Sequence, residues 1–205
     1  MENRLVAQTT HCAMGTVMTH KAFGLYAEDS LAAVCRGIAW LEGLLSRFLP
    51  DSGISRVNGS AGTKSEKVGL ETYDVLSKAV EFSRCFPGCF DVTIAPLVTL
   101  WNIGGESLVQ PDESSIRQVL PLVNYRDLIL DPREMTAGLR DVGQSVDLGG
   151  IGKGFAGDGE MILMIPPKQR LGQIVQRLGR RPFQPCLVQR RQRPGVVVSC
   201  HLLRV

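Results

Sequence analysis

The sequence contains no apolar run of the roughly 18 to 20 residues that a membrane-spanning helix needs. Its first segment, MENRLVAQTTHCAMGT, also lacks the apolar core of a signal peptide. We therefore expect the chain as written to be cytoplasmic. An exported lipoprotein is the alternative if the sequence begins inside a longer protein.

Familiar site patterns are also missing. The six cysteines and three histidines show no zinc-binding spacing, and Cys85 and Cys89 form the only close pair. We interpret the cysteines as free, mostly buried thiols. The chain has neither a P-loop nor the G-x-G-x-x-G dinucleotide fingerprint.

Acidic residues are nearly absent from the last part of the chain. Residues 1–158 contain 14 Lys and Arg against 19 Asp and Glu, whereas residues 159–205 contain nine against one. The net charge therefore changes from −5 to +8 along the chain. Five of the 11 prolines also lie after residue 158. This break predicts a domain over residues 1–158 and a basic, Pro- and Arg-rich tail over residues 159–205.

A glycine-rich segment is the most informative feature that is present. Residues 146–158 read VDLGGIGKGFAGD, with Asp147 ahead of the glycines and Lys153 among them. Glycine allows close approach of a ligand to the backbone, whose N–H groups can bind anions. A turn between a strand and a helix, with Asp147 as a local cap, is the alternative that the pattern alone favours.

The periodicity of apolar residues predicts helices mixed with short strands. We expect strands at 4–10, 14–23, 128–130 and 144–148, and a loop from Ser46 to Gly62. Helices are expected from a cap at Asp29 or Ser30 to Pro50, from a cap at Thr72, over 111–120, and from about Gly152. This order favours an α+β fold in which helices pack on a mixed or antiparallel sheet.

Four segments together resemble the FAD:protein FMN transferase family, and they occur in the family's order. They are Met14-Gly15-Thr16, Ser46 to Asn58 (SRFLPDSGISRVN), Gly88 to Trp101 (GCFDVTIAPLVTLW) and Asp147 to Asp158 (DLGGIGKGFAGD). The departures are few: Gly53 stands where Glu is usual, Val92 where Pro is usual, and Gly152 and Gly157 where Ala and Val are usual. The resemblance implies that residues 1–158 are the N-terminal half of a flavin transferase-like domain.

The resemblance implies a function. Members transfer the FMN part of FAD to a Thr or Ser hydroxyl of an acceptor flavoprotein, release AMP and require Mg²⁺. A subunit of a membrane redox complex is one such acceptor. The resemblance identifies no catalytic residue in this chain. It implies that Gly150 offers its carbonyl to Mg²⁺, and that six residues line the FAD site: Met14, Phe48, Cys89, Phe90, Asp91 and Asp147. Lys153 lies near enough in sequence to face a phosphate.

The resemblance ends at Asp158. The motif that supplies the metal-binding carboxylate in the family is absent from residues 159–205. A catalytically inactive, truncated or frameshifted FAD-binding remnant is therefore the alternative function, and such a chain would be poorly soluble or loosely packed. A basic tail that binds nucleic acid or an anionic lipid surface is a third interpretation. We expect no nucleic-acid partner, because the tail lacks interleaved aromatic residues.

Overall fold

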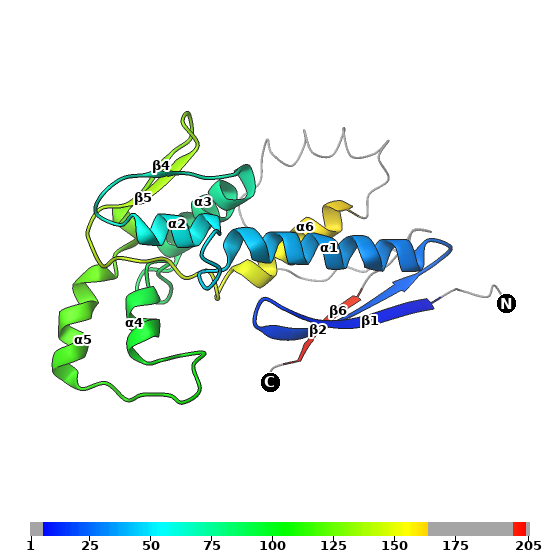
Figure 1. The fold of residues 1–205 in the computed structure, drawn as a ribbon, viewed down its shortest axis with the longest axis horizontal. Helices are drawn as coiled ribbons and strands as arrows, with labels where there is room; N and C mark the ends of the chain where they lie inside the picture. Colours follow the sequence, from blue (N-terminus) through cyan, green and yellow to red (C-terminus); the bar gives the residue numbers. More distant parts are fainter. Residues whose placement is uncertain (1–5, 164–198, 204–205) are drawn as a thin grey trace. The chain divides into compact units, whose positions relative to one another are not determined.

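A computed structural model describes residues 6–163 and 199–203 of the chain (Figure 1). Contacts between residues divide the chain into two compact units. The first contains Met1–Ala39 and Ala156–Val205, and the second contains Trp40–Phe155. The predicted boundary at residue 158 stays a prediction, because most of the predicted tail lies outside the described residues. No helix in the described ranges has the length and apolar character to cross a membrane.

The first unit contains an antiparallel sheet of three strands in the order β1-β2-β6. They are β1 (Val6–Ala13), β2 (Thr16–Phe23) and β6 (Ser199–Leu203). β1 and β2 form a hairpin in which Ala13 pairs with Thr16. Met14 and Gly15 make the turn, with φ angles of 51° and 67°. Positive φ at both turn residues matches the twist of a two-residue hairpin and favours glycine at position 15.

Helix α1 (Ala27–Leu45) covers this sheet with its apolar side chains. Val34 and Ile38 pack with Ala13 and Met18, and Met14 lies against this cluster. The helix begins two residues before the predicted cap at Asp29, and its first turn carries Glu28 and Asp29, which suit the positive end of the helix dipole. It ends at Leu45, five residues before Pro50.

In the second unit, a short helix lies within the segment predicted as a loop between Ser46 and Gly62. This helix, α2, spans Gly53–Gly59 and is capped by Ser52, whose side chain accepts a hydrogen bond from the Ser55 N–H. The next helix, α3, spans Leu70–Cys85 and its N-cap is Gly69. The prediction of Thr72 as that cap was wrong. Thr72 lies inside the helix and is buried, because its position faces the core with Val75 and Leu76.

The second sheet is also antiparallel, with the order β3-β5-β4. Its strands are β3 (Glu66–Lys67), β5 (Thr136–Leu139) and β4 (Leu128–Asp131). The predicted strand at 128–130 is confirmed as β4, whereas β3 and β5 were not predicted. Helix α5 (Glu113–Val119) begins after its cap, Asp112, in agreement with the predicted opening at residues 111–113. The remaining helices of this unit are α4 (Ala95–Leu100) and the short η1 (Leu120–Leu122) and η2 (Tyr125–Asp127).

The predicted strand at 144–148 is only partly formed. Ser145 makes a parallel bridge with Ile94, and the Asp147 N–H donates to the Val92 carbonyl at 2.9 Å. Two segments far apart in sequence therefore run side by side, each carrying one of the predicted acidic site residues. Helix α6 (Gly152–Leu163) follows at the predicted position.

Cys12, Cys35, Cys85 and Cys89 form no disulfide bond, as predicted. Their predicted burial is wrong for Cys12, Cys85 and Cys89, which are exposed, while Cys35 is half-buried. Cys85 and Cys89 lie at the end of α3 and in the turn after it, where the chain has already left the core.

Candidate functional site

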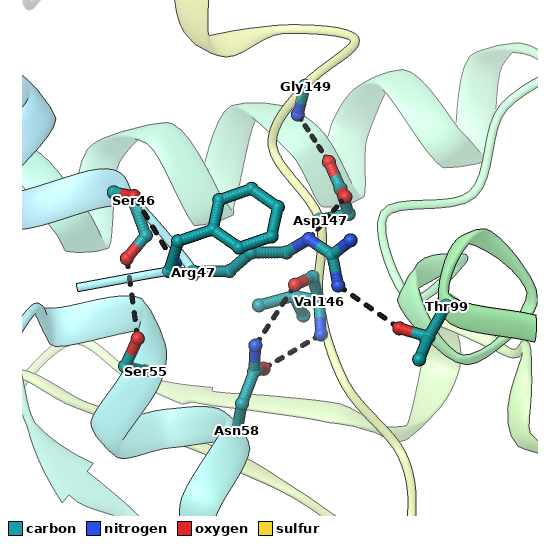
Figure 2. Close-up of polar contacts among 9 residues, drawn as sticks. Ser46, Arg47, Ser55, Asn58, Thr99, Val146, Asp147 and Gly149 are labelled. Atoms are coloured by element: carbon teal, nitrogen blue, oxygen red, sulfur yellow. Dashed lines mark hydrogen bonds and ion pairs between the residues drawn. The ribbon is translucent and has the colours of Figure 1, made fainter. Parts of the chain in front are cut away.

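The backbone fixes Asp147 at the start of the glycine-rich loop. Its carboxylate Oδ1 accepts a hydrogen bond from the Gly149 N–H at 2.6 Å (Figure 2). A β-carbon at position 149 would lie 2.8 Å from that same oxygen, which is closer than a real β-carbon approaches. A side chain at 149 would therefore displace the Asp147 carboxylate from this position. Asp147 therefore caps the loop, as the sequence pattern favoured. The loop already uses its Oδ1 as an acceptor.

Arg47 approaches the other carboxylate oxygen. Its Nε lies 2.9 Å from Asp147 Oδ2, and its Nη1 donates to the Thr99 hydroxyl at 3.2 Å (Figure 2). The contact with Asp147 is an ion pair by distance, although the buried Nε–H is not aligned with any acceptor among the described residues. The guanidinium carbon also lies 4.6 Å from the centre of the Phe48 ring. Arg47 thus joins two predicted site residues, Asp147 and Phe48.

Asn58 holds the residue before Asp147. Its side-chain amide donates to the Val146 carbonyl and accepts from the Val146 N–H, at 3.1 and 2.8 Å (Figure 2). The helix that carries Asn58 is itself tied to the end of α1, because the Ser52 and Ser55 hydroxyls both donate to the Ser46 carbonyl. The segment from Ser46 to Asn58 is therefore a support for the strand-like residues that lead into the loop.

Phe90 packs against the next part of the loop. A β-carbon at Gly150 would lie 3.1 Å from the Phe90 ring, so the ring rests against the bare backbone of that glycine. Phe82 meets Phe90 edge to face, with ring centres 5.2 Å apart. Aromatic pairs of this geometry are favourable, so the ring is held on the loop. Cys89 precedes it and is exposed.

The Asp91 carboxylate is occupied by the chain itself. Oδ1 accepts from the Thr93 N–H and hydroxyl at 2.8 and 2.6 Å, and Oδ2 accepts from the Tyr125 N–H at 3.0 Å. The Thr93 hydroxyl in turn accepts from the Asn124 N–H at 2.8 Å. This network joins the segment before α4 to η2. It gives Asp91 a structural task in addition to the predicted contact with FAD.

Comparisons with known proteins agree with this arrangement. A model of the ApbE family matches residues 14–164. The chain belongs to the ApbE family. An FAD:protein FMN transferase of Klebsiella pneumoniae (strain 342) is 32% identical over 136 residues, which cover 65% of this chain and 43% of that protein. One from Treponema pallidum (strain Nichols) is 30% identical over 122 residues, covering 57% and 34%.

Solved ApbE structures share the α+β fold. The ApbE protein of Thermotoga maritima aligns with a TM-score of 0.71 at 24% identity, over 76% of this chain and 51% of that one. The flavin transferase ApbE of Vibrio cholerae also gives 0.71, at 22% identity, over 78% and 53%. The chain thus spans about half the length of these structures and less than half of the two curated relatives above.

Within this ApbE chain, the second unit contains six of the seven predicted site residues. Four of them belong to the glycine loop or contact it or Arg47: Phe48, Phe90, Asp147 and Gly150. Asp91 precedes Val92, whose carbonyl accepts from the Asp147 N–H, and Cys89 precedes Phe90 in sequence. The seventh, Met14, belongs to the first unit and occupies the hairpin turn. Lys153 is half-buried in the first turn of α6.

Sequence reasoning gave no role to Arg47, Asn58 or Thr99. All three lie inside the segments that carry the resemblance to the ApbE family. These residues could therefore have been noticed as members of the motifs, but their spacing did not indicate contacts with Asp147 or its neighbours.

Proposed function

We propose that the chain binds FAD and contributes to transfer of its FMN part to a Thr or Ser hydroxyl of an acceptor flavoprotein, with release of AMP. The observation that carries this proposal is the convergence of three motif segments on Asp147 and the glycine loop within one compact unit. Both curated relatives described above are named FAD:protein FMN transferases, which supports flavin transfer as the reaction class.

The residues of this unit suit the parts of a flavin nucleotide. The Phe48 ring is 74% exposed and offers an aromatic face to a flat ring system. The Asp147 carboxylate has lone pairs beyond those used by Gly149 and Arg47, so it can accept hydrogen bonds from sugar hydroxyls or ring N–H groups. Cys89, Phe90 and Asp91 remain proposed FAD contacts, together with Met14 from the first unit.

In the transfer, the acceptor hydroxyl oxygen forms a bond to the phosphorus next to riboflavin. The bond between that phosphorus and the oxygen bridging to AMP breaks, AMP leaves, and the hydroxyl proton passes to water. Reactions of this type depend chiefly on positioning and on neutralising phosphate charge. In this structure the Arg47 side chain and the Gly149 N–H together position the Asp147 carboxylate.

The Mg²⁺ requirement is part of the proposal, with the Gly150 carbonyl as its predicted ligand. Among the described residues, no group of three or more His, Cys, Asp or Glu side chains could hold a metal ion. The described side chains therefore do not by themselves fit a complete magnesium site, and the roles given to Arg47, Gly149 and Phe48 do not depend on one. An acceptor that is part of a membrane redox complex also remains a proposal.

The test mixes the chain with FAD, Mg²⁺ and an acceptor flavoprotein, and follows flavin fluorescence of the acceptor after denaturing electrophoresis. A fluorescent acceptor band, absent when the acceptor Thr or Ser is changed to Ala, is the result expected for a transferase. Omission of Mg²⁺ with added chelator tests the metal requirement.

The same mixtures distinguish the alternative. Quenching of free FAD fluorescence without a labelled acceptor would identify the chain as a catalytically inactive FAD-binding remnant of the family. No effect on FAD and no label would reject both functions.

A further inference from the structure

We propose that Arg47 is a positioning residue of the flavin site, which holds the Asp147 carboxylate and the Phe48 ring with one guanidinium group. This inference rests on the proposed function, since it concerns how the same site binds FAD. Arg47 is not among the residues that the family resemblance assigns to the site.

The geometry of Arg47 makes three contacts at once. Nε pairs with Asp147 at 2.9 Å, Nη1 donates to Thr99 at 3.2 Å, and the guanidinium plane lies over Phe48 at 4.6 Å. The partners come from three separate segments: the glycine loop, α4 and the chain after α1. Only a planar group with several fixed donors can do this, so arginine is not replaceable by lysine here.

The effect on Asp147 is to fix both carboxylate oxygens. Gly149 binds Oδ1 and Arg47 pairs with Oδ2, and the Arg47 and Asp147 side chains are only 16% and 17% exposed. A pair this shielded from water is less weakened by solvent than a surface ion pair. The carboxylate is thus held in one orientation before the ligand arrives, and its remaining lone pairs face incoming hydroxyl or N–H donors.

The effect on Phe48 is to leave one ring face for the ligand. The ring is 74% exposed and would otherwise turn freely in solvent. A guanidinium over one face attracts the ring and restrains it. A flavin or adenine ring then stacks on the opposite face, at a lower cost in conformational freedom.

The experiment measures FAD affinity of the full chain by quenching of flavin fluorescence. Arg47→Met is expected to bind FAD about 10- to 100-fold more weakly, by analogy with the loss seen when a residue that orients a metal ligand is removed. Arg47→Lys keeps the positive charge but lacks the planar guanidinium with its fixed donors. We expect its FAD affinity to lie between those of Arg47→Met and the parent chain. Thr99→Val is expected to cause a smaller loss in the same direction. Arg117→Gln, which removes an exposed ion pair with Glu113, is the matched control and is expected to bind like the parent chain.

A double-mutant cycle separates positioning from general stability. If Arg47 acts through Asp147, Arg47→Met weakens binding much less in an Asp147→Asn background than in the parent chain. The quenching per bound flavin should also fall in Arg47→Met, because Phe48 is no longer restrained. Circular dichroism confirms that each variant is folded, and Arg47→Lys and Thr99→Val decide the question if Arg47→Met does not fold.

Each outcome bears on a different claim. FAD affinity of folded Arg47→Met within twofold of the parent overturns the inference and leaves the proposed function standing. Equal losses in the Asp147 and Asp147→Asn backgrounds also overturn it, because Arg47 would not act through that carboxylate. A parent chain that does not bind FAD rejects the proposed function and the positioning role together.

Discussion

Asn58 forms two hydrogen bonds with the backbone of Val146, donating to its carbonyl at 3.1 Å and accepting from its N–H at 2.8 Å. The side-chain amide thus makes the two backbone hydrogen bonds that a neighbouring strand would otherwise make. Val146 is fully buried, so its backbone groups need partners inside the protein. Because Asp147 follows directly, this pairing determines where the glycine loop begins.

Replacing Asn58 by Leu should therefore destabilise the chain. Two buried backbone groups lose their partners, at about 1 to 3 kcal/mol each, so we expect a loss of roughly 2 to 6 kcal/mol in the free energy of unfolding. Urea denaturation measures the change. The control is Gln118→Leu, at an exposed amide of α5, with an expected change within about 0.5 kcal/mol. Equal stability of Asn58→Leu and the parent would contradict the role of Asn58.

Alanine substitutions at Gly150 and Gly154 should change the stability of the chain in opposite directions. Gly150→Ala places a β-carbon 3.1 Å from the half-buried Phe90 ring, which must move by a few tenths of an ångström, so we expect a loss of up to about 1 kcal/mol in the free energy of unfolding. Gly154→Ala meets no atom within 4 Å and lies in α6, so it should gain about 0.5 to 1 kcal/mol. Thermal denaturation of both variants checks the two signs.

A second variant tests the cause of the Gly150 effect. In a Phe90→Leu background the ring edge is gone, so Gly150→Ala should cost less than it does beside Phe90. An unchanged cost would show that the backbone conformation of Gly150, and not the Phe90 contact, requires glycine.

These contacts show what the sequence could and could not predict. Helices α1 and α6 were predictable because apolar periodicity and helix-start residues report local structure. The two N-terminal strands were also predicted, but the strand expected at 14–23 included Met14 and Gly15, which form the turn. Helix α2 was missed because its Ser, Gly and Asn residues suit turns equally well, and only its position on the core selects the helix. The site motifs were visible as a resemblance. The pairing of Asn58 with Val146 joins residues 88 apart, and no local pattern encodes such a contact.

Asp91 illustrates a site residue whose structural task can be measured. Its carboxylate accepts from three donors, two on Thr93 and one on Tyr125. Asp91→Asn keeps one acceptor and brings an NH₂ group against donors, so we expect a loss of about 2 to 3 kcal/mol in the free energy of unfolding. Urea denaturation measures it. Asp74→Asn, which removes only a surface ion pair with Lys78, should change stability by less than about 1 kcal/mol.

The outcome also bears on the flavin site. If Asp91 contacts FAD as the resemblance implies, folded Asp91→Asn should bind FAD more weakly than folded Asp74→Asn. Similar affinities for the two variants would leave Asp91 with the structural task alone.

His20 in β2 should make the stability of the first unit depend on pH. The side chain is fully buried, and neither ring nitrogen has a hydrogen-bond partner among the described residues. Its ring stacks on that of His11, with centres 5.1 Å apart. Burial, and then repulsion from His11, lower the pKa of His20 below its usual 6.5. The unfolded chain therefore takes up the His20 proton more readily than the folded chain.

The sign of the effect follows from this difference. The contribution of neutral His20 is fully present above pH 6.5, and it is lost as the pH falls from 6.5 towards the lowered pKa of the folded state. One proton gives a slope of at most about 1.4 kcal/mol per pH unit. Urea unfolding between pH 8 and pH 5 measures the slope, and the His20 ring signals in NMR report its pKa directly. His20→Phe keeps a ring against His11 but cannot titrate, so its stability should vary less with pH over this range. Two results would contradict this prediction: a His20 that titrates at or above pH 6.5, or a His20→Phe variant with the same pH dependence as the parent. Either would show that burial of this imidazole does not cause the pH dependence of stability, because linkage requires the pKa of the group to differ between the folded and unfolded states.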